Sequence, residues 1–156
     1  MRSVGASVSE TFEAQPESVG RARAAVAQFA ADAGATRREI DDIRLATSEA
    51  VTNSVLHAYR GRPGAIQLTA AVVSDELWVL VADHGCGMQP RDNGPGLGLG
   101  LGLISQISED LAIVPRSSGG TEVRMRFPLE RVERMARPRS PSRGVRNHSA
   151  SARSRR

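Results

Sequence analysis

The chain has 156 residues, which suits one domain with a sizeable hydrophobic core. It contains neither the long apolar run of a membrane span nor the apolar stretch of a secretory leader, so we expect a cytoplasmic protein. All of its basic residues are arginine, which excludes a Walker A lysine and Schiff-base chemistry, and the single Cys86 excludes an internal disulfide and a cysteine-cluster zinc site. The net charge of +4 is uneven, because residues 131–156 hold nine arginines and one acid, whereas residues 1–130 hold twelve arginines and sixteen acids.

The first half of the chain predicts one strand followed by two helices. Residues 6–14 alternate in polarity, as an edge strand does. Apolar residues then recur at helical spacing until Gly34, which ends the first helix. Thr36 and Glu39 form the Thr-x-x-Glu pattern of a capping box, so we expect a second helix from there to about Tyr59.

The second half predicts two hairpins separated by a helix. Residues 65–73 and 77–83 are rich in β-formers and form the first hairpin, and residues 111–115 and 121–129 form the second. Between them we expect a loop and then a helix over about residues 97–108. The order β-α-α-β-β-α-β-β predicts an α/β two-layer sandwich, with an antiparallel or mixed sheet covered on one face by helices.

The chain divides into a folded part and a tail. Residues 1–130 are expected to form the domain, and residues 131–156 a basic tail rich in Arg, Ser and Pro. Such a composition has little to bury, so we predict that the tail is disordered.

Glu49 and Asn53 lie four residues apart on the second predicted helix and therefore share one face. The amide oxygen of an asparagine is a hard ligand that suits Mg²⁺, and a neighbouring glutamate can accept a proton from an attacking hydroxyl. An ordinary solvated helix face is the alternative interpretation of this pair.

Asp83 ends an apolar strand and is followed by Gly85 and Gly87. A carboxylate at that position needs a hydrogen-bond donor, and the exocyclic amine of adenine is a suitable one. The two glycines allow the backbone to pass close to a flat base. A plain strand-to-loop turn would produce the same pattern.

Alternating glycines from Gly94 to Gly102 lead into the third predicted helix. Glycines at the start of a helix expose N–H groups to a phosphate, and the helix dipole favours its negative charge. No register of this run satisfies the dinucleotide pattern G-x-G-x-x-G. A hinge without a ligand is the alternative.

Together these motifs resemble the GHKL superfamily of ATP-binding folds, over about residues 8–129. The matching residues are Glu49 and Asn53 (the N-box), Asp83, Gly85 and Gly87 (the first glycine box), Gly98 and Gly100 (the second), and Thr121. Residues 44–59 further resemble the signature helix of the small anti-sigma factor serine kinases within this superfamily.

The resemblance implies a Bergerat-type sandwich that binds ATP and Mg²⁺. It implies that Asn53 holds the metal, that Asp83 pairs with the adenine amine, that Thr121 lies near it, and that Glu49 acts as base. The implied partners are a sigma factor and a STAS-type anti-anti-sigma antagonist, whose serine receives the phosphate, and a second copy in a homodimer. We expect no membrane association and no direct contact with nucleic acid.

Two other functions fit the same motifs. One is a module that binds ATP and sequesters a partner without phosphotransfer. The other is the ATPase domain of a sensor kinase, although no upstream helix carries an acceptor histidine. The roles of His57, one turn beyond Asn53, and of Cys86, inside the first glycine box, stay open.

Overall fold

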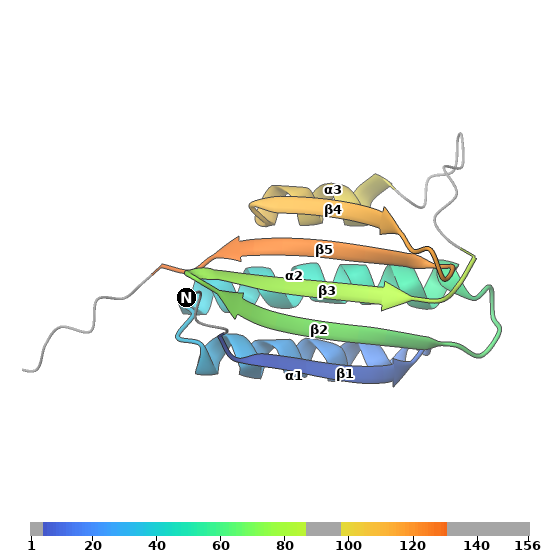
Figure 1. Cartoon of the computed structure of the whole chain (residues 1–156), viewed down its shortest axis with the longest axis horizontal. Helices are drawn as coiled ribbons and strands as arrows, with labels where there is room; N and C mark the ends of the chain where they lie inside the picture. The colour runs from blue at the N-terminus through green and yellow to red at the C-terminus, as the bar shows by residue number, and fades with distance from the viewer. Residues whose placement is uncertain (1–4, 87–97, 131–156) are drawn as a thin grey trace, which may run out of the picture.

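The computed structural model describes residues 5–86 and 98–130. Within them, five strands form one antiparallel sheet in the order β1-β2-β3-β5-β4 (Figure 1). The strands are β1 (Ser7–Glu13), β2 (Ala65–Val73), β3 (Glu76–Asp83), β4 (Asp110–Pro115) and β5 (Thr121–Pro128). The predicted tail, residues 131–156, lies outside the described residues.

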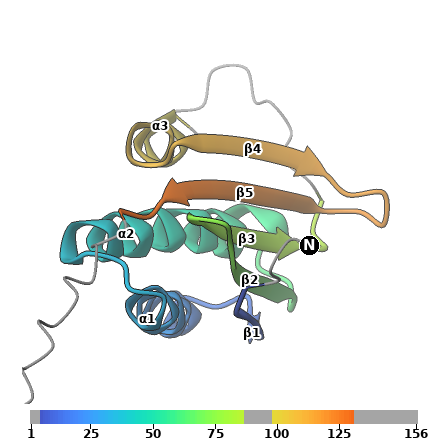
Figure 2. The ribbon, with the colours of Figure 1, turned by 60° about the vertical axis from the view of Figure 1, so that its left-hand side comes forward.

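The helices α1 (Glu17–Asp32), α2 (Arg37–Asn53) and α3 (Gly98–Ile107) all cover the same face of the sheet (Figure 2). The predicted two-layer α/β sandwich is therefore confirmed, and its sheet is antiparallel rather than mixed. The predicted capping box is also present. Thr36 accepts a hydrogen bond from the backbone N–H of Glu39, whose carboxylate in turn accepts one from the N–H of Thr36.

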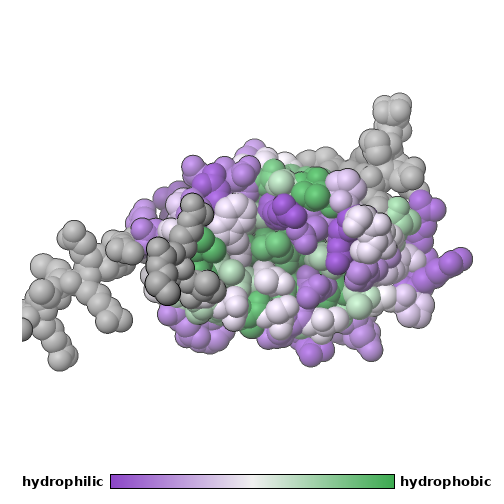
Figure 3. Space-filling view, in the orientation of Figure 1, coloured by the Kyte–Doolittle hydropathy of each residue, from purple (hydrophilic) through white to green (hydrophobic). Residues whose placement is uncertain are grey.

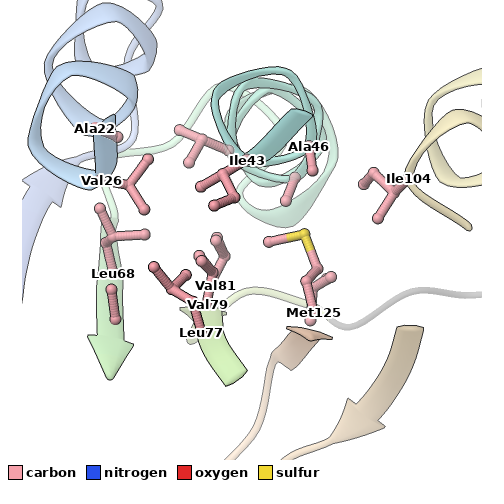
Figure 4. Packing of buried hydrophobic residues seen from close by; sticks show 14 of the residues in the cluster. Ala22, Val26, Ile43, Ala46, Leu68, Leu77, Val79, Val81, Ile104 and Met125 are labelled. Carbon is pink, nitrogen blue, oxygen red and sulfur yellow. The ribbon is translucent and has the colours of Figure 1, made fainter. Parts of the chain in front are cut away.

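The core lies between the three helices and the sheet, with α2 in the middle (Figure 4). Ile43 and Ala46 of α2 project toward the strands, and Ile104 of α3 packs beside them. The strands contribute alternate residues, as expected when one face of a sheet is buried. Fully buried examples are Leu68, Leu77, Val79, Val81 and Met125.

The opposite face of the sheet carries polar and apolar residues side by side (Figure 3). Its charged side chains include two ion pairs, Arg126 with Glu76 at 2.6 Å and Arg124 with Glu122 at 2.5 Å. Among the described residues, no helix is both long and apolar enough to cross a membrane.

The second helix differs from its prediction in one respect. It was expected to continue as an α-helix to about Tyr59, but the α-helix ends at Asn53 and a π-helical turn, η1 (Ser54–Ala58), follows. A π-turn takes more residues per turn than an α-helix and has no simple sequence signature. It changes which side chains face the sheet after Asn53.

Thr47 offers a test of the packing of α2. Its side chain is fully buried, and its hydroxyl has no hydrogen-bond partner among the described residues. Thr47→Val keeps the shape and removes the unpaired hydroxyl, so we expect the free energy of unfolding to rise by about 1 kcal/mol. Thr47→Ser is the matched control, because it keeps the hydroxyl and loses the methyl, and it should lower stability. Urea denaturation measures both; a destabilised Thr47→Val variant would show that the hydroxyl is paired.

Candidate functional site

Asp83 is the best-defined candidate residue, because it is a buried carboxylate at the end of β3 with only 5% of its surface exposed. One carboxylate oxygen, Oδ1, accepts hydrogen bonds from the backbone N–H groups of Gly85 at 3.0 Å and Thr121 at 3.2 Å. The other, Oδ2, accepts one from the hydroxyl of Ser54 at 3.2 Å. An ionised carboxylate has about four acceptor positions, so one remains for a ligand.

Thr121 reaches Asp83 because β3 and β5 are neighbours in the sheet. The register pairs Ala82 with Glu122, so the first residue of β5 lies beside the last residue of β3. Thr121 is itself buried, with 5% exposure. Two of the predicted site residues, far apart in sequence, thus lie in direct contact.

The turn between β4 and β5 closes over the same strand end. A guanidinium nitrogen of Arg116, Nη1, donates to the backbone carbonyl of Asp83 at 3.0 Å and lies 3.3 Å from Nε2 of His84. Gly120 follows in this turn with a φ of +90°. A Cβ at Gly120 would lie 2.0 Å from the carbonyl oxygen of Asp83, so the turn can approach the strand only with glycine there.

The loop after β3 packs on the π-turn. The N–H of Cys86 donates to the carbonyl of Ala58 at 2.9 Å, and a Cβ at Gly85 would lie 2.1 Å from that same oxygen. Glycine is therefore needed at position 85 for a different reason from the predicted one. It allows the loop to pack closely on η1, whereas we expected it to allow close approach of the backbone to a base. Gly87 lies outside the described residues.

Glu49 and Asn53 are both half-buried on α2. Each follows by three residues a buried alanine, Ala46 and Ala50 respectively, so the pair borders the buried face of the helix. Figure 4 shows Ala46 on the side of α2 that faces α3. Asn53 directly precedes Ser54, which contacts Asp83. Asn53 is thus the direct sequence neighbour of a residue that contacts Asp83, and Glu49 lies about one helical turn before it.

Gly98 is the first residue of α3, and Gly100 lies in the first turn of this helix. The predicted helix over residues 97–108 is confirmed with bounds shifted by one residue at each end. The preceding glycines, from Gly94 to Gly96, lie outside the described residues. Within the described part, the glycine motif does coincide with the N-terminus of a helix, where free N–H groups favour an anion.

Three residues around Asp83 were not singled out from the sequence. Ser54 lies within the signature helix of residues 44–59 but was given no role there, and Arg116 lies in no motif, so the sequence offered no signal for either contact. Gly120 was not singled out either, although two consecutive glycines directly before a strand are a signal of unusual backbone.

His57 of η1 and Cys86 of the loop after β3 are both exposed. The sulfur of Cys86 lies 3.6 Å from the backbone carbonyl of His57. His57 lies in the π-helical turn four residues after Asn53 and is exposed, whereas Asn53 is half-buried.

The turn that contacts Asp83 can be tested with a pair of glycine variants. Gly119 and Gly120 have similar φ values, +91° and +90°, but only Gly120 lacks room for a Cβ. Gly119→Ala should lower the free energy of unfolding by about 1–2 kcal/mol through backbone strain alone. Gly120→Ala should cost about 3 kcal/mol or more, because it also clashes with the backbone of Asp83. Equal losses in urea denaturation would contradict the close approach of this turn.

The residues present fit an adenine nucleotide with Mg²⁺. Asp83 retains an acceptor position for an amine, since three of about four are used. Asn53 supplies a half-buried amide oxygen of the kind that Mg²⁺ prefers, and the half-buried carboxylate of Glu49 lies about one helical turn before it.

Comparison with known proteins gives consistent results. Residues 12–127 match the model of a protein family described as the histidine kinase-like ATPase domain. The anti-sigma F factor of Clostridium acetobutylicum is 29% identical over 78% of this chain and 93% of its own length. The anti-sigma F factor of Caldanaerobacter subterraneus subsp. tengcongensis is 34% identical, over 73% of this chain and 87% of its own length.

A solved structure is similar as well. It is the crystal structure of the RsbU and RsbW domains of a Mycobacterium tuberculosis protein, with a TM-score of 0.63 and 26% identity over 80% of this chain. The present chain spans about a third of that longer chain, 32% of its length.

Proposed function

The chain belongs to the histidine kinase-like ATPase (GHKL) family and to its anti-sigma factor group, and from this premise we propose that it is an ATP-dependent protein serine kinase that also sequesters a sigma factor. The relatives support the function that the family resemblance implied. The observation that carries the proposal is the buried Asp83, with an acceptor position open to an amine. The half-buried Glu49 and Asn53 lie on the helix that leads directly into Ser54, the residue that contacts Asp83.

In the proposed reaction, the hydroxyl oxygen of a serine on an antagonist protein attacks the γ-phosphorus of ATP. The bond between that phosphorus and the bridging oxygen breaks, ADP leaves, and the carboxylate of Glu49 accepts the hydroxyl proton. Asp83 and Thr121 orient the adenine end of the nucleotide, so that the reacting end is held in place.

Asn53 would hold the Mg²⁺ through its amide oxygen. When bound, this ion neutralises charge on the phosphates. Backbone N–H groups at the start of α3, including Gly98 and Gly100, would add hydrogen bonds to the phosphates.

The proposed partners are a sigma factor, a STAS-type antagonist and a second copy of the chain in a homodimer, all in the cytoplasm. In this scheme the unphosphorylated antagonist displaces the sigma factor, and its phosphorylation returns the sigma factor to the bound state. The proposed domain comprises residues 1–130, and residues 131–156 form a separate basic tail.

Capture of partners from the source cell tests this proposal. The tagged full chain is used as bait in Mg²⁺ with either ATP or ADP, and bound proteins are identified by mass spectrometry. We expect a sigma factor and a small antagonist that carries phosphoserine after incubation with ATP. Capture of an unphosphorylated antagonist in the presence of ATP would favour sequestration without phosphotransfer. Recovery of neither protein, despite measured ATP binding, would contradict the proposed function.

A further inference from the structure

The hydrogen bond between Ser54 and Asp83 joins two segments that are 29 residues apart in the sequence. Ser54 is the first residue of η1, and it is buried with 5% exposure. Asp83 is equally buried, so the contact lies away from bulk water. In such surroundings a hydrogen bond to a charged acceptor is stronger than it would be at the surface.

The two oxygen atoms of Asp83 are held in different ways. Oδ1 accepts two backbone N–H groups, from Gly85 and Thr121, which fix the end of the side chain to the main chain. Among the described residues, Oδ2 accepts a hydrogen bond from Ser54 alone. Since an oxygen of a carboxylate offers about two acceptor positions, the open one belongs to Oδ2. A ligand amine would therefore share this oxygen with the hydroxyl of Ser54.

The π-turn connects Ser54 to the end of β3 at a second point. At the far end of η1, the carbonyl of Ala58 accepts a hydrogen bond from the N–H of Cys86, which follows Asp83 by three residues. Gly85 packs on the same carbonyl without space for a side chain. Both ends of η1 are thus attached to the segment that carries Asp83, which limits how far the hydroxyl of Ser54 can move relative to the carboxylate.

We propose that Ser54 is a positioning residue for nucleotide recognition. Its hydroxyl orients Oδ2 of Asp83 toward the 6-amino group of adenine and so contributes to the preference for ATP over purine nucleotides that lack this amine. This inference rests on the proposed function, because it assumes that Asp83 receives adenine. It goes beyond the residues to which the resemblance assigns a role, since Ser54 acts only through Asp83.

Nucleotide analogues separate this role from a purely structural one. The affinities of the wild type and of Ser54→Ala are measured by calorimetry in Mg²⁺, with ATP and with purine riboside triphosphate, which lacks the 6-amino group. Removing the hydroxyl should weaken ATP binding by about three- to tenfold. Binding of purine riboside triphosphate should change by less than about twofold, because this analogue has no amine for Oδ2 to accept.

Two further variants serve as controls. Ser18→Ala makes the same substitution at a fully buried serine of α1, whose hydroxyl is unpaired among the described residues, and it should change neither affinity. Ser54→Thr keeps the hydroxyl and should retain the wild-type ratio of the two affinities. It also serves as the test if Ser54→Ala does not fold, because loss of that ratio in a folded Ser54→Thr variant would overturn the proposal.

The outcomes distinguish the inference from the function on which it rests. An equal loss of affinity for both nucleotides in Ser54→Ala would mean that Ser54 only maintains the fold, and this would overturn the inference while leaving the ATP site intact. An unchanged affinity for ATP would overturn it as well. Failure of the wild-type protein to bind ATP would overturn the proposed function itself, and with it the inference.

Discussion

Glu49→Gln is expected to abolish most phosphotransfer while leaving the affinity for ATP nearly unchanged. The amide has almost the same shape as the carboxylate but cannot accept the proton of the attacking serine. General-base catalysis contributes about 10²- to 10⁴-fold to a rate, so phosphorylation of the antagonist should slow by that factor. Single-turnover transfer from labelled ATP, measured beside calorimetric ATP binding, checks both parts of this prediction.

The matched control is Asp41→Asn, the same acid-to-amide change at an exposed position on the same helix. It should transfer phosphate at the wild-type rate. If Glu49→Gln also transfers at the wild-type rate, Glu49 is not the base. If it loses ATP binding instead, its carboxylate acts in binding rather than in proton transfer.

Asp83→Asn is expected to weaken ATP binding by about ten- to a hundredfold without unfolding the protein. The amide oxygen can take the place of Oδ1 and accept the N–H groups of Gly85 and Thr121. The amide NH₂ then occupies the place of Oδ2, where Ser54 can accept from it through its hydroxyl oxygen. The amide NH₂ would present a donor to the adenine amine, which is also a donor. Recognition of adenine is therefore lost although the packing around residue 83 remains.

Asp110→Asn, at an exposed acid that begins β4, is the matched control and should leave ATP binding unchanged. Urea denaturation of Asp83→Asn provides the second measurement, because it checks that the variant is still folded. Unaltered ATP affinity in a folded Asp83→Asn variant would contradict the placement of adenine at this carboxylate.

The sequence predicts the fold well where local patterns determine structure. The capping box at Thr36 and Glu39 was identified because both of its hydrogen bonds lie within four residues. The strand over residues 65–73 has the predicted bounds, since its alternation and the turns that flank it are local signals. The resemblance to the GHKL superfamily and its anti-sigma group is confirmed by the comparisons.

The π-turn was not predicted, because its apolar residues fit the continuation of an α-helix equally well. Both of its ends contact a distant segment, through Ser54 at one end and Ala58 at the other. Tertiary contacts of this kind override a local preference and leave no trace in residue spacing.

The surroundings of Asp83 were only partly predictable for the same reason. The motif pointed to the carboxylate itself, and the family resemblance pointed to Thr121 near it. The sequence did not reveal the hydroxyl of Ser54 or the guanidinium of Arg116, because both depend on how β3, η1 and the β4–β5 turn meet in space. The sequence did identify Gly85, but it did not predict the close packing of Gly85 on Ala58.

Transfer of the γ-phosphate of ATP to a serine of the captured antagonist, in Mg²⁺ and with the purified full chain, tests the central claim most directly. We expect intact-mass spectrometry to detect one added phosphate on the antagonist, and peptide mapping to locate it on a serine. We also expect the reaction to slow with Glu49→Gln and to keep its wild-type rate with Asp41→Asn. An antagonist that binds the chain with ATP yet stays unphosphorylated would contradict the claim that this protein is a kinase.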